Sequence, residues 1–308
     1  MKIAVMGSGG VGGYFGARLA ASGNDVTFIA RGTHLEAMRA KGLLLDSDIG
    51  RLHLQPVNAV ADASDVPEAD AIIFAVKMRD TESAAQSLRG LTAKGATVFT
   101  FQNGVESAAR VGGILGRDKV VEGAARIAAS ISEPGVIKQI GNFARMEFGD
   151  AGGAHGAATR AFHEACIAAG IDAALSDNIA RTIWLKFAML APMAGMTALT
   201  RGPIGPVRDA PAARALLQAA VNEAVAVGVA LKAGLEMEDA AKTMRLIDGL
   251  PRAVMASMCH DLLAGKPIEI DGLSGAVARL AQANGVSAPT HAFIAGALAP
   301  FRDGKPAD

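Results

Sequence analysis

The 308-residue sequence contains only two cysteines, Cys166 and Cys259. They cannot form the disulfide framework typical of small secreted proteins, and no cysteine–histidine cluster has the spacing of a zinc site. None of the six histidines forms a pair at the spacing of a metal site or a catalytic triad. We therefore expect no bound metal, and we expect the protein to reside in a reducing cytoplasm.

The sequence also lacks an excess of charge, with 30 basic and 30 acidic residues. Proteins that bind nucleic acid or an anionic membrane usually carry a basic surplus, so we expect neither partner. No signal peptide is visible, because the N-terminus already has the pattern of a strand. One membrane-like run, residues 183–199, contains Lys186 and Pro192 and is short for a membrane span. We expect a buried helix that is kinked at Pro192.

The first 31 residues have the pattern of a strand, a glycine-rich turn, a helix and a second strand. The apolar run 2–6 leads into Gly7-Ser8-Gly9-Gly10-Val11-Gly12, and a second apolar run, residues 26–30, ends at Arg31. This order is the opening of a dinucleotide-binding fold. The alternative is a glycine-rich turn in another kind of α/β protein.

The glycines in this turn match the needs of a bound dinucleotide. Gly7 permits a tight turn, Gly9 permits a pyrophosphate to approach the backbone, and Gly12 permits the helix to pack closely on the strand. Arg31 stands where NAD-binding proteins usually have Asp or Glu for the ribose hydroxyls. Because a guanidinium suits a 2′-phosphate, we predict NADP(H) as the cofactor. The alternative for Arg31 is a solvated surface arginine.

The remaining sequence falls into two regions. Up to residue 175, strand patterns alternate with helical ones. Buried strands are predicted at 71–76 and 96–101, and short strands within 43–60 and at 119–122, 126–131, 136–140 and 144–148. Helices are predicted at 33–40, 80–91, 106–115 and 157–169. The turn Glu133-Pro134-Gly135 indicates antiparallel pairing of the later strands. From residue 176 the predicted elements are helices, at 177–191, 212–233, 237–246, 252–264, 271–284 and 290–298.

These patterns predict an α/β protein of two domains. The first, residues 1–175, is a Rossmann-type dinucleotide-binding domain, and the second, residues 176–308, is all-α. Ligands bind beyond the carboxyl ends of strands in open parallel sheets. Lys77 follows the strand 71–76, and Asn103 closely follows the strand 96–101. Asn103 suits the carboxamide of a nicotinamide, and Lys77 suits the substrate or a ribose. The alternatives are a turn residue before Gly104 and a solvated loop lysine.

The helical region must supply a proton donor and a substrate clamp. Lys186 is the only charged residue between Arg181 and Arg201. A buried ammonium is costly unless it is paired or functional, so Lys186 is the candidate donor. The alternative is a lysine at the rim of a helix with its charge in solvent.

Glu269 is the candidate partner of Lys186. Alternatively, Glu269 or Asp271 caps the helix that follows. Ser257 and Asp261 lie four residues apart on one predicted helix, so their side chains are expected on the same face and in the same cleft.

Together, these features resemble the ketopantoate reductase (2-dehydropantoate 2-reductase) family over nearly the whole chain. In the first region the likeness rests on the glycine turn with Arg31, on Ala75-Val76-Lys77 and on Gln102-Asn103-Gly104. In the helical region it rests on Trp184-Leu185-Lys186-Phe187, on Ser257-Met258 with Asp261, and on Pro267-Ile268-Glu269-Ile270-Asp271. The residues that the resemblance assigns to NADPH are Gly7, Ser8, Gly9, Gly10, Val11, Gly12, Arg31, Lys77, Asn103 and Glu269. It also implies that Lys186 is the catalytic lysine, that Glu269 works with it, and that Asn103 and Ser257 contact the substrate.

The chain departs from the family pattern in two regions. The family usually has asparagines four and eight residues after the catalytic lysine, where this chain has Leu190 and Ala194. In addition, Asp271-Gly272-Leu273-Ser274-Gly275 stands where Asp-Tyr-Ile-Asn-Gly is common. A site that lacks buried hydrogen-bonding groups discriminates less for the hydroxyls they serve, which favours a less polar 2-keto acid.

The sequence thus predicts an NADP-dependent oxidoreductase that reduces a 2-keto acid to a 2-hydroxy acid. The first candidate reaction is ketopantoate to D-pantoate, a step toward pantothenate, with the proton from Lys186. The alternatives are a related hydroxyacid or opine-type dehydrogenase and a non-catalytic NADP(H) sensor. The expected partner is a small-molecule 2-keto acid, and apolar helices in the second domain are compatible with a homodimer.

Overall fold

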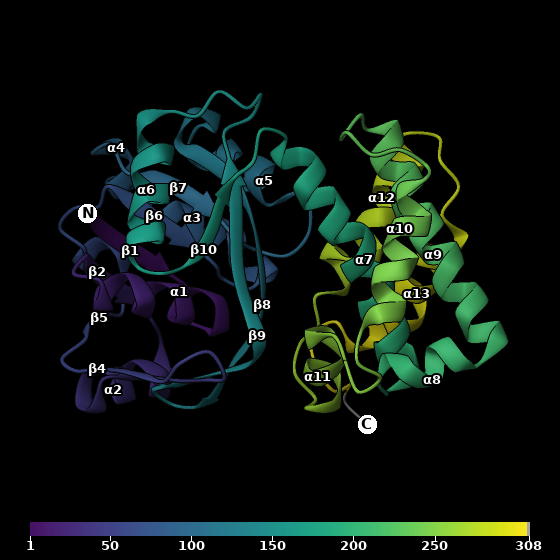
Figure 1. Cartoon of the computed structure of the whole chain (residues 1–308), viewed down its shortest axis with the longest axis horizontal. Coiled ribbons are helices and arrows are strands. Elements are labelled where there is room, and N and C mark those ends of the chain that lie inside the picture. The colour runs from purple at the N-terminus through teal and green to yellow at the C-terminus, as the bar shows by residue number, and fades with distance from the viewer. Residues whose placement is uncertain (307–308) are drawn as a thin grey trace. The chain divides into compact units, whose positions relative to one another are not determined.

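The computed structural model describes residues 1–306, and the chain divides into two compact units (Figure 1). The first unit contains Met1–Gln102 and Glu106–Ile179. The second contains Asn103–Val105 and the chain from Ala180 onward. The short segment Asn103–Val105 is thus grouped with the helical unit, although it follows the strand Thr97–Thr100 of the first unit.

Within residues 1–306, the first unit is built on a single ten-stranded sheet. Its strands are β1 (Lys2–Met6), β2 (Asp25–Ile29), β3 (Leu43–Ser47), β4 (Leu52–Leu54), β5 (Asn58–Val60), β6 (Ala71–Phe74), β7 (Thr97–Thr100), β8 (Val120–Glu133), β9 (Val136–Gly149) and β10 (Asp172–Leu175). The order across the sheet is β4-β3-β9-β8-β7-β6-β1-β2-β5, with β10 beside β9. The strands from β8 to β5 in this order are parallel, which is the arrangement of a Rossmann-type domain.

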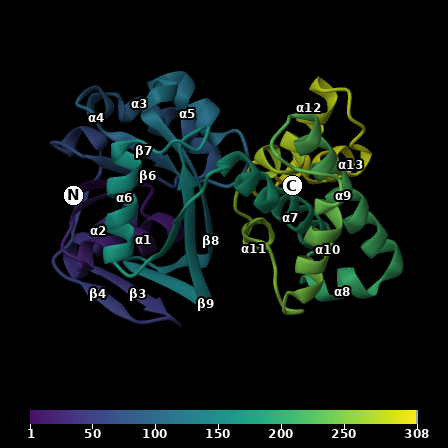
Figure 2. The same ribbon diagram turned by 45° about the horizontal axis from the view of Figure 1, so that its top comes forward.

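Helices cover both faces of the parallel strands (Figures 1 and 2). They are α1 (Gly10–Ala21), α2 (Gly32–Lys41), α3 (Thr81–Ser87), α4 (Arg89–Ala93), α5 (Ser107–Leu115) and α6 (Ala157–Ala168). One apolar core joins α1, α2 and α6 to the sheet, and another joins α3, α4 and α5 to the opposite face. Burial on both faces explains why β1, β6 and β7 are apolar at almost every position.

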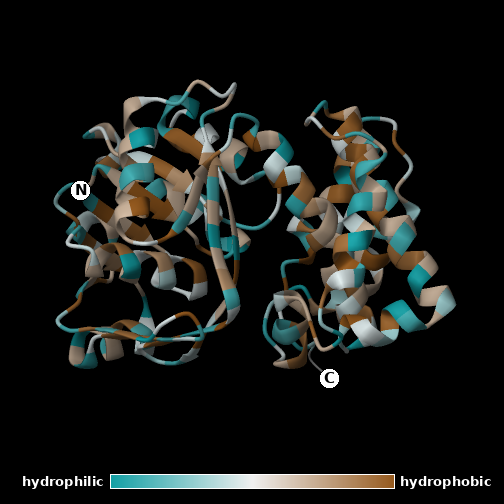
Figure 3. Cartoon of the chain, in the orientation of Figure 1, coloured by the Kyte–Doolittle hydropathy of each residue, from teal (hydrophilic) through white to brown (hydrophobic). Residues whose placement is uncertain are grey.

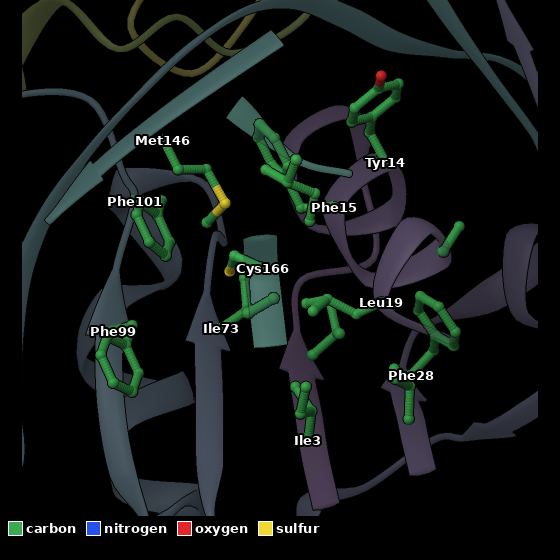
Figure 4. Close-up of a cluster of buried hydrophobic side chains, with 14 of the residues drawn as sticks. Ile3, Tyr14, Phe15, Leu19, Phe28, Ile73, Phe99, Phe101, Met146 and Cys166 are labelled. Carbon is green, nitrogen blue, oxygen red and sulfur yellow. The ribbon is translucent and has the colours of Figure 1, made fainter. Parts of the chain in front are cut away.

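The first core is dense with large side chains (Figure 4). Phe15 and Leu19 of α1 lie over Ile3 of β1 and Ile73 of β6, and all four are at most 2% exposed. Phe99 of β7 stacks on the ring of Phe162 from α6 at 4.2 Å between centroids. This packing holds the start of α1 firmly against the end of β1.

The sequence predicted the parallel strands well and the later strands less well. The four short strands predicted between 119 and 148 are wrong in extent, because β8 and β9 form one long antiparallel hairpin. Irregular pairing at Ile127/Ala128 and Ile131/Glu133 interrupts the alternation and made the strands look short. β10 was not predicted, since it is a four-residue strand with two alanines. The helix predicted at 80–91 is divided at Leu88, close to Gly90.

The second unit is helical within the described residues. Its helices are α7 (Ile179–Thr200), α8 (Ile204–Asp209), α9 (Pro211–Ala230), α10 (Asp239–Gly249), α11 (Ser257–Leu263), α12 (Ser274–Ala283) and α13 (Pro289–Leu298). Hydrophilic and hydrophobic stretches alternate along them (Figure 3). Glu223 of α9 is buried and accepts hydrogen bonds from the backbone N–H groups of Thr290 and His291, both at 2.9 Å. This carboxylate therefore caps the first turn of α13.

Three expectations for this unit are wrong. The end predicted at 191 is wrong, whereas the buried helix expected over residues 183–199 is confirmed, since α7 runs through Pro192 to Thr200. Burial of Ala191, Met193 and Ala194 outweighs the lost backbone bond. No helix is predicted between 191 and 212, yet α8 lies there, with Pro206 in its first turn, where proline is tolerated. α11 begins at 257 rather than 252, because the carbonyl of Arg252 accepts from Gly205 N–H at 3.0 Å.

Two helices of the described chain, α7 and α9, are long and apolar enough to span a membrane by length and composition alone. The most apolar stretch of α7 is 61% buried within the protein, and that of α9 is 44% buried. Buried core helices pass the same test, so this is weak evidence for a membrane span.

Candidate active site

The turn after β1 has the geometry of a phosphate cradle. Gly7 has a φ of +97°, which side-chain-bearing residues rarely adopt, and a Cβ there would lie 2.7 Å from Val76 N. Gly9 is the N-cap of α1, and a Cβ at Gly9 would meet no atom within 4 Å. The backbone before α1 is therefore open to an anion at a helix N-terminus, which fits the pyrophosphate of a dinucleotide.

The other glycines of the turn permit close contacts inside the protein. A Cβ at Gly12 would lie 2.3 Å from the Gly7 carbonyl oxygen, so α1 packs on β1 only without a side chain here. A Cβ at Gly10 would lie 2.1 Å from the carbonyl oxygen of Ala129 on β8. Gly9 is thus the glycine with space around it, whereas Gly10 and Gly12 are required by the fold.

Two side-chain contacts that the sequence did not predict hold the turn. The Ser8 hydroxyl donates to the Ile29 carbonyl of β2 at 3.0 Å. His34 of α2 accepts from Gly135 N–H at Nδ1, so its Nε2 carries the proton and donates to the Ser8 carbonyl, both at 3.0 Å. Burial lowers the pKa of His34, which keeps the ring neutral. His34 therefore joins the glycine turn to the β8–β9 turn, and no motif in the sequence marks it.

Arg31 follows β2 as predicted and is the N-cap of α2. Its side chain is 77% exposed, and its Nη2 donates to Asp80 Oδ2 at 2.8 Å. Asp80 ends the 3₁₀ turn Met78–Asp80 that follows β6. Arg31 is thus an exposed arginine that is anchored by Asp80 at the carboxyl edge of the sheet, beside the glycine turn.

Lys77 and Gln102 also lie at the strand ends of the first unit. Lys77 is exposed and is the N-cap residue of the 3₁₀ turn after β6. Gln102 is buried, and its amide donates to the Val76 carbonyl at 3.0 Å and to the Thr81 hydroxyl at 2.9 Å. Gln102 therefore holds neighbouring loops together, while Lys77 remains the candidate for ligand binding.

Lys186 lies on the apolar helix α7 of the second unit and is half-buried. Its Nζ donates to the Asn103 side-chain oxygen at 3.1 Å. The two residues are 83 positions apart in the sequence, so the structure brings together the predicted donor and the predicted amide. Trp184 and Phe187 beside Lys186 are buried in an edge-to-face pair at 5.5 Å, which identifies them as core residues.

Glu269 is half-buried and precedes the 3₁₀ turn Ile270–Gly272. Its side chain makes no capping hydrogen bond to that turn. Asp271 instead pairs with Arg302, with Nε and Oδ2 at 2.7 Å. Neither this turn nor the following helix α12 has a side-chain cap, so the capping alternative is wrong and Glu269 remains a candidate partner of Lys186.

Ser257 is the first residue of α11 and is exposed. The rest of this short helix is anchored by buried Met258 and Cys259, whose Sγ donates to the Thr197 carbonyl of α7 at 3.2 Å. Asp261, one turn later, is half-buried. The structure thus attaches the Ser257 helix to the helix that carries Lys186.

The two positions on α7 that depart from the expected pattern differ from each other. Leu190 on α7 is half-buried, whereas Ala194 is fully buried in the helical core. A neighbouring residue, Gly195, has no room for a side chain, since a Cβ there would lie 2.7 Å from Ile294. An amide is therefore compatible with position 190 but would overpack position 194.

Comparison with known families decides the class of the protein. Residues 3–153 match the family model "Ketopantoate reductase PanE/ApbA", and residues 178–301 match the model of its C-terminal region. The chain belongs to the ketopantoate reductase family. Members of this family are oxidoreductases that use a nicotinamide cofactor, so the chain is an enzyme of that class. Its Rossmann-type and helical architecture is that of the family.

Individual relatives agree with the family assignment. The chain is 29% identical to the 2-dehydropantoate 2-reductase of Mesorhizobium japonicum, over 94% of each chain. It is 28% identical to the uncharacterized oxidoreductase YkpB of Bacillus subtilis, over 94% of this chain and 95% of that protein. The crystal structure of a PanE/ApbA family ketopantoate reductase from Ralstonia eutropha matches with a TM-score of 0.90 and 30% identity, over 98% of each chain.

A further structural neighbour is D-mandelate dehydrogenase in complex with NADH and anilino(oxo)acetate. It matches with a TM-score of 0.88 and 24% identity, over 98% of each chain, which shows a shared fold. Within residues 1–306, no group of three or more His, Cys, Asp or Glu side chains is placed to hold a metal ion.

Proposed function

We propose that the protein reduces a 2-keto acid to a 2-hydroxy acid with NADPH, and that ketopantoate, reduced to D-pantoate, is its first candidate substrate. Membership of the ketopantoate reductase family supports the reaction class. The observation that carries the catalytic part is the hydrogen bond from Lys186 to Asn103. In this proposal residues 1–175 act as the cofactor domain and residues 176–308 as the catalytic domain.

Lys186 acts as the proton donor. Its ammonium donates to the keto oxygen of the substrate and passes a proton to it as negative charge develops there. The neutral amine then regains a proton from solvent. When bound, the nicotinamide supplies the hydride that forms the new C–H bond.

The neighbours of Lys186 position it and the substrate. Asn103 accepts from the ammonium through Oδ1, which leaves the amide nitrogen as a donor for a substrate oxygen. Glu269, which does not cap a helix, serves as the acceptor for Lys186 or for a substrate hydroxyl. Ser257 contributes a hydroxyl to substrate binding.

The cofactor assignment rests on the first unit. The open backbone at Gly9 and the N-terminus of α1 support pyrophosphate binding. Arg31 at the end of β2 supports binding of a 2′-phosphate, and hence NADP(H) over NAD(H). Lys77 is proposed to bind the ribose or the substrate.

A panel of keto acids, followed by NADPH absorbance, tests the proposal. We expect ketopantoate to give the highest kcat/KM. A higher kcat/KM with another keto acid would assign the protein to a related hydroxyacid or opine-type dehydrogenase. NADPH binding without oxidation by any keto acid would indicate a sensor and contradict catalysis.

A second candidate substrate is a 2-keto acid less polar than ketopantoate. Leu190 and Ala194 place apolar groups on α7 four and eight residues after Lys186. Leu190, which is half-buried, then offers no amide from α7 to a substrate hydroxyl, so the site discriminates less against substrates without that hydroxyl. Phenylpyruvate and 2-ketoisovalerate in the same panel test this candidate.

We also propose a cytoplasmic location, a role in pantothenate synthesis if ketopantoate is the substrate, and a homodimer. Light scattering at several protein concentrations tests the dimer.

A further inference from the structure

One contact beside the glycine turn has no part in the reaction proposed above. Arg31 follows β2, and Asp80 lies shortly after β6. β1 lies between these two strands, because Met6 pairs with Ile29 on one side and with Phe74 on the other. The ion pair between Arg31 and Asp80 therefore spans the carboxyl end of β1, where the glycine turn begins.

Asp80 is also close to a second arginine. Arg79 Nε lies 4.0 Å from Asp80 Oδ1, while Arg31 Nη2 lies 2.8 Å from Oδ2. Both guanidinium groups are largely exposed, at 59% for Arg79 and 77% for Arg31, whereas Asp80 is 26% exposed. A single carboxylate thus offsets two cations at this edge of the sheet.

The residue after the second strand of a dinucleotide-binding fold meets the ribose 2′ position. The atom that contacts Arg31 is a carboxylate oxygen, so negative charge already lies beside the guanidinium that would hold a 2′-phosphate. A phosphate must share Arg31 with this carboxylate and is repelled by it. An uncharged 2′-hydroxyl is not repelled.

We propose that Asp80 is a specificity-determining residue that restrains the preference of this site for NADP over NAD. The inference rests on the proposed binding of a nicotinamide dinucleotide at the glycine turn. Asp80 reduces the positive charge that Arg31 and Arg79 present to the 2′ position. Removing its charge makes the site more selective for the 2′-phosphate.

The variant Asp80→Asn tests this proposal, because it removes the charge and keeps the shape of the side chain. Titration calorimetry would measure the Kd values of NADP⁺ and NAD⁺ for the wild type and the variant. We expect the Kd of NADP⁺ to fall by roughly three- to thirtyfold at low salt, as for partly screened charges a few ångströms apart, and that of NAD⁺ to change less than about twofold. The gain should shrink in high salt.

Glu82→Gln is the matched control. Glu82 is an acid of the same segment, but it pairs with Arg110, with Nε and Oε1 at 2.8 Å. We expect this variant to leave the ratio of the two Kd values unchanged. An equal gain in Glu82→Gln would show a general charge effect and overturn the proposal.

Two results with Asp80→Asn would also overturn it. An unchanged ratio would show that Asp80 does not influence the 2′ group. Weaker NADP⁺ binding would show that Asp80 instead holds Arg31 in place for the phosphate. If the wild type binds neither nucleotide, the proposed function itself fails, which separates the two hypotheses.

Discussion

The glycine turn and the region around Lys186, the two parts of the proposed site, are built in different ways. The turn uses main-chain geometry: a positive φ at Gly7, open space at Gly9 and an unobstructed helix N-terminus. The Lys186 region uses one charged side chain on an apolar helix and one amide 83 residues away. A backbone cradle suits any pyrophosphate, whereas a site made of a few side chains is specific and easily altered.

The polar contacts of the two regions differ in the same way. Around the turn, Ser8 and His34 bond to backbone groups of other segments and fix the loop. Around Lys186, the contact with Asn103 is between side chains. Substitution in the first region should therefore affect cofactor binding and folding, and substitution in the second should affect turnover.

The largest effect is expected from Lys186→Ala. If Lys186 is the proton donor, kcat should fall by roughly 10²–10⁴-fold, the usual loss for a general acid, while the Kd of NADPH stays nearly constant. Steady-state kinetics with the best substrate of the panel and a separate NADPH titration measure both quantities. Lys232→Ala, an exposed lysine of the same unit, is the control and should keep full activity. Near-normal turnover in Lys186→Ala would remove Lys186 from the mechanism.

The backbone geometry of the glycine turn could be predicted more fully than the contacts around Lys186, because the residues of the turn are contiguous. Steric rules predict a tight turn at Gly7, open backbone at Gly9 and close helix packing at Gly12. The contact of Gly10 with Ala129 depends on β8 and could not be predicted locally. The structural role of His34 could not be predicted, because its hydrogen-bond partners, Ser8 and Gly135, lie 26 and 101 residues away in the sequence. The ion pair of Asp80 with Arg31 could not be predicted for the same reason, since the two residues are 49 positions apart.

In the helical region the sequence singled out candidate residues whose roles stay predictions, and it misplaced several helix ends. Lys186 was notable as a lone charge, but its contact with Asn103 depends on tertiary structure. Whether Glu269 caps a helix also had to come from the structure. The apolar run at residues 183–199 already indicated a buried helix through Pro192, and the burial of Ala191, Met193 and Ala194 explains why α7 continues past the proline.

A second difference lies in the two buried histidines, one in each unit. His34 uses both ring nitrogens, whereas His291 Nε2 bonds to the Ala220 carbonyl at 3.0 Å and its Nδ1 has no partner within the described residues. Burial lowers the pKa of His291 from 6.5 to about 4. The His291 ring therefore binds a proton more readily in the unfolded chain than in the folded one. Its contribution to the free energy of unfolding is fully present above pH 6.5 and is lost as the pH falls toward 4.

We expect His291 to account for about 3 kcal/mol of the stability lost over this range, at about 1.4 kcal/mol per pKa unit. Urea unfolding at pH 7 and pH 4.5 measures the loss for the wild type and for His291→Gln, in which this titration is absent. The pH dependence should be weaker in the variant. The exposed His260 provides a control, because His260→Gln should retain the wild-type dependence. Equal losses in the wild type and His291→Gln would refute the assignment.

A pair of glycine variants separates cofactor binding from folding within the first unit. A methyl at Gly9 meets no protein atom, so Gly9→Ala should keep the wild-type Tm but weaken NADPH binding by about 1–3 kcal/mol, the usual cost of overpacking. Gly10→Ala places a methyl 2.1 Å from the Ala129 carbonyl and should lower the Tm. Thermal unfolding and NADPH titration measure both effects. Unaltered NADPH affinity in Gly9→Ala would argue against pyrophosphate binding at this turn.

The smallest effect is expected from Leu190→Asn, which makes the substrate region more polar. Leu190 is half-buried, so an amide there can reach water or substrate without disturbing the core. One added hydrogen bond to a substrate hydroxyl is worth about 0.5–1.5 kcal/mol, and kcat/KM for ketopantoate relative to 2-ketoisovalerate, which lacks the hydroxyl, should rise by roughly two- to tenfold. Ala194→Asn should instead destabilise the protein, because Ala194 is fully buried. A ratio unchanged in Leu190→Asn would place the hydroxyl-binding groups elsewhere than on α7, and the apolar residue at 190 would then say nothing about the substrate.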